Sequence, residues 1–350
     1  MGSLELKSIE IRYGRETIIR DFSLRVEDKE LVSVLGPSGT GKTTLLKSIA
    51  GFIRPYHGDI LVNGVSVLHI PPEKRDIVMV FQKPLLFPFL TVAENIAFGL
   101  KMKKKIGPNE RKKIKDIMIL TRLEGLGDRK THEISGGQQQ RVSLARALVL
   151  EPSILLMDEP LSNLDANLRS EMRDLVRDIL SETGATTLFV THDQSEALMI
   201  SDKVALVLSG KMRQFGEPRQ LFHYPKDPET ARFFGGVNFI PAKVMDGFIQ
   251  TEPLLPSFRF KAAKGVSNGV SGFLYFRPEN AVLKRKDTGG ISCNVEKTIF
   301  EGSMIRMNLK TPLGTFEALS TDNGFHRGEA LFLHVSEGDI RFFPENMADK

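Results

Sequence analysis

The stretch Gly36–Thr44, GPSGTGKTT, decides the fold of this chain. It fits the pattern G-x-x-x-x-G-K-[ST] of a phosphate-binding loop. Its three glycines carry no side chain, so backbone N–H groups can turn inward onto an anion. Lys42 adds a positive charge for the β and γ phosphates of a nucleotide, and the Thr43 hydroxyl is a ligand for Mg²⁺. The stretch therefore predicts a site for a nucleoside triphosphate and its metal ion.

The sequence on both sides of the loop supports this prediction. Leu31–Leu35 is a short apolar run that predicts a buried strand. From Thr43 onward the apolar residues fall at helical spacing, and Gly51 marks the end of the helix. Bound phosphates would then meet a helix N-terminus, where unpaired N–H groups and the helix dipole favour negative charge.

Two further stretches specify the kind of hydrolase. Ile134–Arg141, ISGGQQQR, places a hydroxyl and two glycines at the start of a helix, which is a second anion site by the same physics. Ser153–Pro160, SILLMDEP, predicts a buried strand with Asp158 and Glu159 at its carboxyl end, where ligands bind in open α/β sheets. Taken singly, the first is also typical of a turn before a core helix, and the second of a helix cap.

In this order the three stretches resemble the ATP-binding-cassette (ABC) transporter ATPases, over about the first two-thirds of the chain. Ile134 stands where the family usually has leucine, a conservative change. The resemblance implies an α/β P-loop nucleotide hydrolase with an antiparallel β subdomain, a RecA-like core and a helical subdomain at about residues 85–150. The predicted ATP-binding domain spans residues 1–235. Residues 236–350 are punctuated by glycine and proline and predict a small all-β domain, similar to the OB-like TOBE domain of importer ATPases.

The resemblance implies roles for individual residues in hydrolysing ATP with Mg²⁺. Glu159 polarises the attacking water, and Lys42, Gln82 and His192 complete the catalytic set. The implied metal ligands are Thr43, Gln82 and Asp158, and Tyr13 stacks on adenine. The implied nucleotide-binding residues are Tyr13, Gly36, Pro37, Ser38, Gly39, Thr40, Gly41, Lys42, Thr43, Thr44, Gln82, Ser135, Gly136, Gly137, Gln138, Asp158, Asp165 and His192.

Several of these residues have a simpler explanation on their own. Tyr13 is also typical of a turn without a ligand, Gln82 of a strand cap, and a lone His192 of a structural residue. The apolar segment Lys83–Phe89 fits either a docking cleft for a partner helix or inter-domain core. Asp193 with Glu196 three residues later predicts a reciprocal helix cap.

The resemblance also implies partners. Two cassettes, in a homodimer or with a paralogous cassette, pack head to tail, so that each signature helix covers the ATP held by the other subunit. Membrane permease subunits and, indirectly, an extracytoplasmic substrate-binding protein complete the importer. The run from Phe332 to Pro344 is most similar to ferric-iron importers, and Asn238–Pro241 to polyamine importers. Ferric iron is the preferred cargo, with polyamine, sulfate or molybdate, and sugar as alternatives.

Composition limits the remaining possibilities. A length of 350 residues predicts about two domains. No uninterrupted apolar run reaches the roughly 18 residues of a membrane span. Cys293 is the only cysteine, which excludes an internal disulfide and favours a reducing cytosol. With the resemblance, these features predict a peripheral subunit on the cytoplasmic face of the inner or plasma membrane.

A basic run raises the question of nucleic acid. Apolar residues at 114, 117, 118 and 123 have helical spacing, which predicts that the basic residues form the solvated face of a helix and bind no nucleic acid. The basic residues are Lys101, Lys103, Lys104, Lys105, Arg111, Lys112, Lys113 and Lys115.

Two rival classes remain at this point. A soluble ABC ATPase acting on ribosomes or DNA usually carries two cassettes or a long coiled-coil insertion, whereas this sequence has one phosphate loop. A P-loop kinase or GTPase leaves Ser135–Gln138 unexplained and would need the guanine-reading Asn-Lys-x-Asp, which this sequence lacks.

Overall fold

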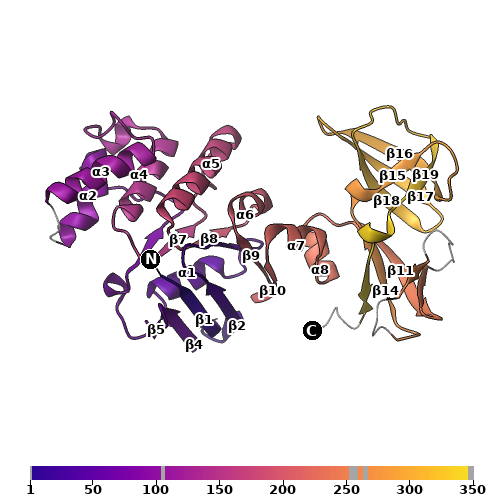
Figure 1. Ribbon diagram of the computed structural model, residues 1–350, viewed down its shortest axis with the longest axis horizontal. Helices are drawn as coiled ribbons and strands as arrows, with labels where there is room; N and C mark the ends of the chain where they lie inside the picture. Colours follow the sequence, from indigo (N-terminus) through magenta and orange to yellow (C-terminus); the bar gives the residue numbers. More distant parts are fainter. Residues whose placement is uncertain (1, 104–106, 252–258, 263–266, 346–350) are drawn as a thin grey trace. The chain divides into compact units, whose positions relative to one another are not determined.

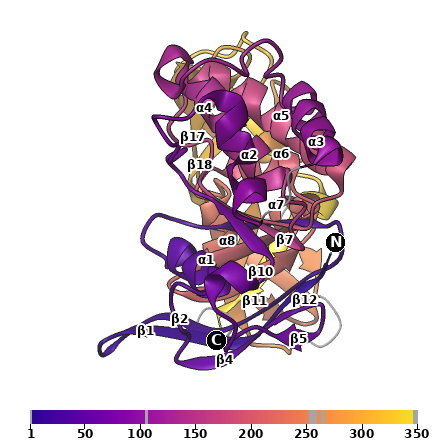
Figure 2. The same ribbon diagram turned by 90° about the vertical axis from the view of Figure 1, so that its left-hand side faces the viewer.

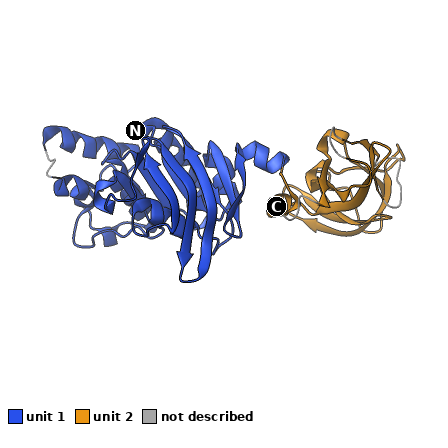
Figure 3. Ribbon diagram, turned by 90° about the horizontal axis from the view of Figure 1, so that it is seen from below, with its two compact units in different colours: residues 1–224 blue, residues 225–350 orange. Residues whose placement is uncertain are grey.

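The computed structural model describes residues 2–103, 107–251, 259–262 and 267–345. It divides the chain into two units, Met1–Tyr224 and Pro225–Lys350, which Figure 3 colours separately. Because this division falls between Tyr224 and Pro225, the sequence-based domain boundary after residue 235 stays a prediction. Lys104 and Lys105 of the basic run lie outside the described residues.

The first unit contains an antiparallel sheet with the strand order β2-β1-β4-β5. Its strands alternate buried and exposed side chains, as expected for a sheet with one face on the core. An Asn63–Gly64 turn joins the last two strands, and both of its residues have positive φ. The strands are β1 (Leu4–Tyr13), β2 (Glu16–Val26), β4 (His57–Val62) and β5 (Val65–Ser66).

A six-stranded sheet with the order β10-β9-β3-β8-β7-β6 forms the centre of this unit. Five of its strands are parallel, and β10 returns antiparallel to β9 as the predicted hairpin. Every residue of β3, β7 and β8 is buried, which explains their continuous apolar runs. The strands are β3 (Leu31–Leu35), β6 (Ile77–Val80), β7 (Ile154–Asp158), β8 (Thr187–Thr191), β9 (Lys203–Leu208) and β10 (Lys211–Gly216).

Two hydrophobic cores cover the two faces of the central sheet. One core joins alternate residues of β3, β7 and β8 to helix α1 and to the antiparallel sheet. The other joins the opposite faces of the same strands to helices α2 to α5 (Figures 1 and 2). The carboxyl ends of β7 and β8 therefore emerge side by side, with Asp158 paired to Val190.

The helices of the first unit begin and end largely where the sequence predicts. Gly51, with a φ of 90°, ends α1, and Gly184 ends α5. On α3, Ile117 is buried while Arg111, Lys112, Lys113 and Lys115 are exposed, so the described part of the basic run is a solvated helix face as predicted. The helices are α1 (Lys42–Ala50), α2 (Val92–Met102), α3 (Pro108–Leu120), α4 (Gly136–Leu148), α5 (Ala166–Thr183), α6 (Gln194–Ile200) and α7 (Pro218–His223).

In its described residues, the second unit is all β apart from helix α8 (Pro228–Phe233) and short 3₁₀ turns. Two five-stranded antiparallel sheets, β13-β12-β11-β14-β20 and β15-β19-β16-β17-β18, enclose one core, as predicted for the OB-like domain. The strands are β11 (Asn238–Met245), β12 (Phe248–Thr251), β13 (Phe260–Lys261), β14 (Ser271–Phe276), β15 (Val282–Lys284), β16 (Ile291–Phe300), β17 (Ile305–Thr311), β18 (Gly314–Ser320), β19 (Ala330–His334) and β20 (Arg341–Pro344).

The single cysteine, Cys293, lies on β16 inside the core of the second unit. Its Sγ faces the carbonyl oxygen of Leu331 at 3.4 Å. Burial raises the pKa of the thiol to about 11, so the reactive thiolate is scarce near neutral pH.

Candidate functional site

The phosphate-binding loop follows β3 and runs directly into α1. At Gly36, a Cβ atom would lie 2.1 Å from the carbonyl oxygen of Val207, so only glycine fits beside the neighbouring strand. Gly41 has a φ of 89°, in the left-handed region, and precedes the first helical residue. These two glycines let the loop curl tightly between the sheet and the helix, as the sequence predicts.

Lys42 is almost completely buried, with 4% of its surface exposed. Its Nζ donates to the carbonyl oxygens of Gly36 at 2.8 Å and Pro37 at 2.7 Å. Burial lowers the pKa of this amine, while the negative charges of Glu159 and Asp158 oppose that shift. The loop thus holds a cation on its concave side, where the phosphates of a nucleotide would be drawn.

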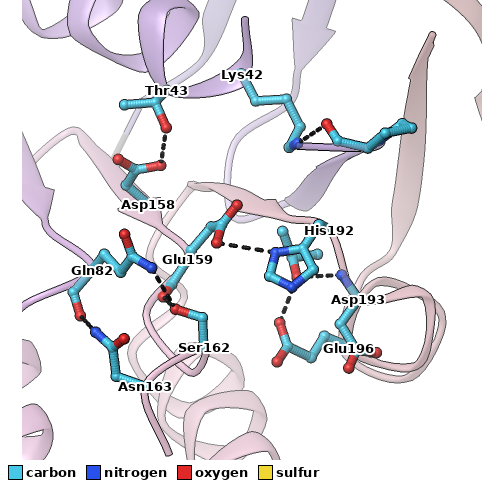
Figure 4. A network of polar contacts seen from close by, with 12 residues as sticks. Lys42, Thr43, Gln82, Asp158, Glu159, Ser162, Asn163, His192, Asp193 and Glu196 are labelled. Carbon is cyan, nitrogen blue, oxygen red and sulfur yellow. Dashed lines mark hydrogen bonds and ion pairs between the residues drawn. The ribbon is translucent and has the colours of Figure 1, made fainter. Parts of the chain in front are cut away.

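Thr43 and Asp158 meet beside this cation (Figure 4). The Thr43 Oγ1 donates to Asp158 Oδ1 at 2.8 Å, from α1 to the carboxyl end of β7. Asp158 is 7% exposed, and burial raises the pKa of its carboxyl above the ordinary value. A hydroxyl and a carboxylate oxygen side by side fit Mg²⁺, which takes one or two protein oxygens along with phosphates. Among the described residues, no three His, Cys, Asp or Glu side chains form a metal cage of their own.

Glu159 and His192 face each other across the ends of β7 and β8 (Figure 4). The Oε2 of Glu159 lies 3.0 Å from the Nδ1 of His192. Glu159 has a φ of 45°, a strained conformation for a residue with a side chain, and its N–H donates to the Val190 carbonyl oxygen at 2.9 Å. Strain of this kind collects at functional sites, and here it turns the carboxylate away from Asp158 and toward His192.

Gln82 is tied to the loop that follows Glu159 (Figure 4). Its Nε2 donates to Ser162 Oγ at 3.0 Å, and its carbonyl oxygen accepts from Asn163 Nδ2 at 3.0 Å. Ser162 Oγ in turn donates to the Glu159 carbonyl oxygen at 2.9 Å. The family resemblance places Ser162 in the segment Leu161–Asp165, the loop that links two subunits, but the sequence did not predict its bond to Gln82. The available signal was a hydroxyl three residues after Glu159, the spacing of a side chain that closes a turn.

A cavity of about 290 Å³ opens beside the phosphate loop. Tyr13, which is 53% exposed, and Glu159 line it together with most of the loop. Ile18 also lines it and was not anticipated, because a branched apolar residue in a predicted strand carries no signal for a ligand. The predicted residues that line the cavity are Tyr13, Ser38, Gly39, Gly41, Lys42, Thr43, Thr44 and Glu159. Gly36 and Pro37 contact Lys42, and Thr40 donates to the Pro37 carbonyl oxygen at 2.9 Å.

The signature residues do not join this cavity within the described part of the chain. Ser135 caps α4: its hydroxyl accepts from the Gln138 N–H, and the Gln138 side chain accepts from the Ser135 N–H. Ser135 and Gly136 are exposed, and an added Cβ at Gly136 would meet no atom within 4 Å, whereas Gly137 is buried and a Cβ there would lie 2.7 Å from Leu168. The first residues of α4 therefore have an open side at Ser135 and Gly136. Asp165 caps α5 through the Leu168 N–H at 2.9 Å and also does not line the cavity.

The predicted reciprocal cap at the start of α6 is half wrong. Asp193 accepts from the N–H groups of Ser195 and Glu196 as expected. Glu196 does not reach back to Asp193, because the Thr191 hydroxyl stands between them. That hydroxyl accepts from the Asp193 N–H at 2.9 Å and donates to Glu196 Oε2 at 2.6 Å. Glu196 is thereby buried under the His192 loop, and burial raises the pKa of its carboxyl.

A second hollow, the Phe87 groove, lies on the helical side of the first unit and has a volume of about 320 Å³. The side chains of Leu85 and Phe89 are 59% and 70% exposed. The groove is lined by Phe81, Leu85, Phe87, Phe98, Arg146 and Leu150, among others. None of the described helices is long and apolar enough to cross a membrane.

Comparisons with known proteins place this geometry in a family. A sequence model described as ABC transporter matches residues 19–162. The chain is 41% identical to the Fe(3+) ions import ATP-binding protein FbpC 1 of Pectobacterium atrosepticum, over 85% of this chain and 84% of that protein. It is 39% identical to the spermidine/putrescine import ATP-binding protein PotA 1 of Pseudomonas aeruginosa, over 91% and 90%.

Solved structures agree with this similarity. The cbiO1 protein of Clostridium perfringens, part of the cbiONQ ABC transporter complex, is 29% identical with a TM-score of 0.57, covering 62% of this chain and 89% of that one. An ATP-binding cassette solved as a dimer after hydrolysis, with ADP and phosphate bound, is 30% identical with a TM-score of 0.55, covering 62% and 99%. The chain belongs to the ABC transporter family and is an ATP-binding, ATP-hydrolysing subunit of an importer.

Proposed function

We propose that two copies of this subunit, or one copy and a paralogous cassette, pair head to tail around two ATP molecules. Each cavity beside the phosphate loop then receives the open start of α4, Ser135–Gln138, from the other subunit. The proposal is supported by the split seen in one chain, where the loop side of a triphosphate pocket is present but the second anion-binding helix end does not line it. The solved dimeric relative with ADP and phosphate is a precedent.

In this proposal the residues divide the work of phosphoryl transfer. Lys42 and the loop N–H groups hold the β and γ phosphates, and Tyr13 stacks on adenine. Thr43, Asp158 and Gln82 hold Mg²⁺, which neutralises charge on the β and γ phosphates when bound. Glu159 accepts a hydrogen bond from the attacking water, and His192 orients Glu159 and contacts the γ-phosphate. The water oxygen bonds to the γ-phosphorus, the bond to the bridging oxygen breaks, and ADP, phosphate and a proton leave.

One observation carries this assignment: Glu159 lines the cavity and lies 3.0 Å from His192, beside the buried cation of Lys42. Replacing Glu159 by Gln keeps the size and the strained backbone but removes the basic oxygen. We expect Glu159→Gln to bind ATP with an affinity within about threefold of the wild type, and to lose turnover by about a hundredfold or more. Because the closed state no longer decays, the variant should accumulate as an ATP-bound dimer.

The measurement is single-turnover hydrolysis together with light scattering of the ATP-loaded protein. Glu182→Gln is the matched control, because this exposed acid on α5 does not line the cavity. Wild-type turnover in Glu159→Gln would remove this carboxylate from the role.

The Phe87 groove is the proposed docking site for the membrane permease. Its exposed apolar side chain Leu85 stands three residues after Gln82, which the proposal places at the metal. The subunit would then sit peripherally on the cytoplasmic face of the membrane, with a substrate-binding protein on the far side. Co-purification with a permease from membranes should be lost in Leu85→Asp, which places a charge on an exposed residue of the groove; retention of the permease by that variant would exclude this groove.

Ferric iron is the proposed cargo. The relatives named as iron importers include the one described above at 41% identity, and the run Phe332–Pro344 points the same way. Polyamine is the alternative, since the PotA relative is of nearly equal identity. The binding protein encoded beside this subunit should bind ferric iron and not spermidine in calorimetric titrations; the reverse result would favour the polyamine assignment.

A further inference from the structure

The segment Gln82–Phe87 is the wall that contributes Leu85 and Phe87 to the Phe87 groove, and hydrogen bonds hold it at both ends. At one end, Gln82 is held by Ser162 and Asn163, as described above. At the other, Asn95 is completely buried and brackets Phe87, accepting from its N–H at 2.9 Å and donating to its carbonyl oxygen at 3.1 Å. Any movement of this wall is therefore concentrated in its middle.

The middle of the wall is held by Arg146. The Nη2 of Arg146 donates to the Pro84 carbonyl oxygen and its Nη1 to the Leu85 carbonyl oxygen, each at 3.0 Å. The guanidinium also lies 5.6 Å from the centre of the Phe87 ring. Its planar fork presents two donors in fixed directions, so the two carbonyls and the arginine form one unit.

Leu85 is the residue through which a partner would act on this unit. Its φ of 44° is strained for a residue with a side chain, and 59% of its surface is exposed. A helix seated in the groove would press on this side chain. The carbonyl of the same residue is bonded to Arg146, so Leu85 can shift only by breaking that bond or by carrying the arginine with it.

Arg146 stands in the last turn of α4, and Ser135 caps the first turn of the same helix. Ten residues separate Gly136 from Arg146, which corresponds to about 15 Å along a helix axis. Most residues of α4 are buried, so the helix moves as a rigid rod. A displacement of Arg146 therefore also displaces Ser135, at the opposite end of the helix.

We propose that Arg146 is a positioning residue that converts occupancy of the Phe87 groove into the orientation of the signature residues Ser135–Gln138. This inference rests on the proposed function, in which the groove receives the permease and the signature residues complete the site of the other subunit. Arg146 is not among the residues that line the nucleotide cavity of the described chain, so its effect passes through α4.

The test compares Arg146→Gln, Arg146→Lys and the control Arg177→Gln in the full chain. Arg177 is an exposed arginine on α5 that also donates to a backbone carbonyl, that of Met199 at 3.1 Å, away from the groove. We expect Arg146→Gln to lower kcat for ATP by about three- to thirtyfold while KM stays within about twofold. Arg146→Lys should recover part of kcat, because an ammonium can reach one of the two carbonyls. Arg177→Gln should match the wild type.

Amide hydrogen exchange supplies a second readout that a merely local role would not move. Loss of Arg146 should speed exchange at the amides of residues 85–87 and also at Ile134–Arg141, at the far end of α4. Faster exchange confined to residues 85–87, or an unchanged kcat in Arg146→Gln, would overturn the inference. Equal losses in Arg146→Gln and Arg177→Gln would overturn it too, because they would indicate general destabilisation.

The same experiments distinguish failure of the proposed function from failure of the inference about Arg146. If Glu159→Gln traps an ATP-bound dimer while Arg146→Gln behaves as wild type, only the inference about Arg146 falls. If Glu159→Gln turns over normally, the proposed function itself falls, whatever Arg146 does.

Discussion

At the scale of single residues, two neighbouring acids are given different tasks by their surroundings. Asp158 ends β7, is 7% exposed and meets the Thr43 hydroxyl. Glu159 is turned by its positive φ toward His192 and the nucleotide cavity. Burial raises the pKa of Asp158, so a bound cation is the natural compensation for its charge. In the proposed function, the end of β7 thus separates a carboxylate that binds the metal from one that binds the attacking water.

Thr43→Val tests the metal-binding half of this pair. Valine has the shape of threonine but lacks the oxygen that lies 2.8 Å from Asp158. We expect the Mg²⁺ concentration for half-maximal hydrolysis to rise by about tenfold or more. Thr183→Val is the control, because the Thr183 hydroxyl also makes one hydrogen bond of 2.8 Å, but to the Ile179 carbonyl oxygen on α5, away from the cavity. An unchanged Mg²⁺ requirement in Thr43→Val would argue against this ligand.

At the scale of elements, helix α6 carries a buried acid close to His192. Glu196 is 2% exposed and receives the Thr191 hydroxyl at 2.6 Å. Asp193, which caps the helix, also lies 3.7 Å from Arg169 on α5. The same arginine donates to the carbonyl oxygens of Ser162 and Leu164, in the loop after Glu159. These bonds fix the two loops that present Glu159 and His192 against each other.

Glu196→Gln should change how stability depends on pH. Burial raises the pKa of Glu196 in the folded protein, so the folded state binds this proton more tightly than the unfolded state. Wild-type stability therefore falls as pH rises from the ordinary glutamate range through the raised pKa. The glutamine variant lacks this titration and should gain stability relative to the wild type between about pH 4.5 and 7.5.

Urea denaturation at the two pH values measures this difference. Glu182→Gln, at an exposed position on α5, serves as the control. If the difference in unfolding free energy between Glu196→Gln and the wild type is the same at both pH values, ionisation of this buried acid does not destabilise the folded protein.

At the scale of the whole molecule, the proposed head-to-tail dimer divides each site between two chains. Lys42→Ala damages the loop side, and Ser135→Arg damages the signature side with a bulky charge. Each variant alone should be inactive. In a mixed dimer, however, one of the two sites takes its loop from one chain and its signature from the other, and both are intact.

Mixing the two inactive variants in equal amounts should therefore restore hydrolysis. Random pairing gives half mixed dimers with one good site each, or about a quarter of wild-type activity. The hydrolysis rate of the wild-type protein should also rise more steeply than linearly with its concentration, at concentrations so low that most chains are monomers. No recovery on mixing, with pairing verified by light scattering, would mean that each chain builds its site alone.

Much of the site was predictable because its residues lie in short contiguous patterns. The loop Gly36–Thr44 and the pair Asp158–Glu159 reveal their chemistry by sequence spacing, and the flanking apolar runs locate them at strand and helix ends. The bonds between segments were not predictable. Ser162 reaches Gln82, 80 positions away, and Arg146 reaches Leu85, 61 positions away. The predicted cap by Glu196 was wrong because the Thr191 hydroxyl on β8 takes the place of its carboxylate at the Asp193 N–H.

The position of Cys293 has a practical consequence for anyone who handles this protein. The single thiol is buried inside the C-terminal β unit and stays protonated there, so its rate of chemical modification reports on exposure of that core. A disulfide reagent in solution can modify it only when the two sheets around it part. The labelling rate of Cys293 would therefore measure how often that unit opens spontaneously, without an engineered cysteine.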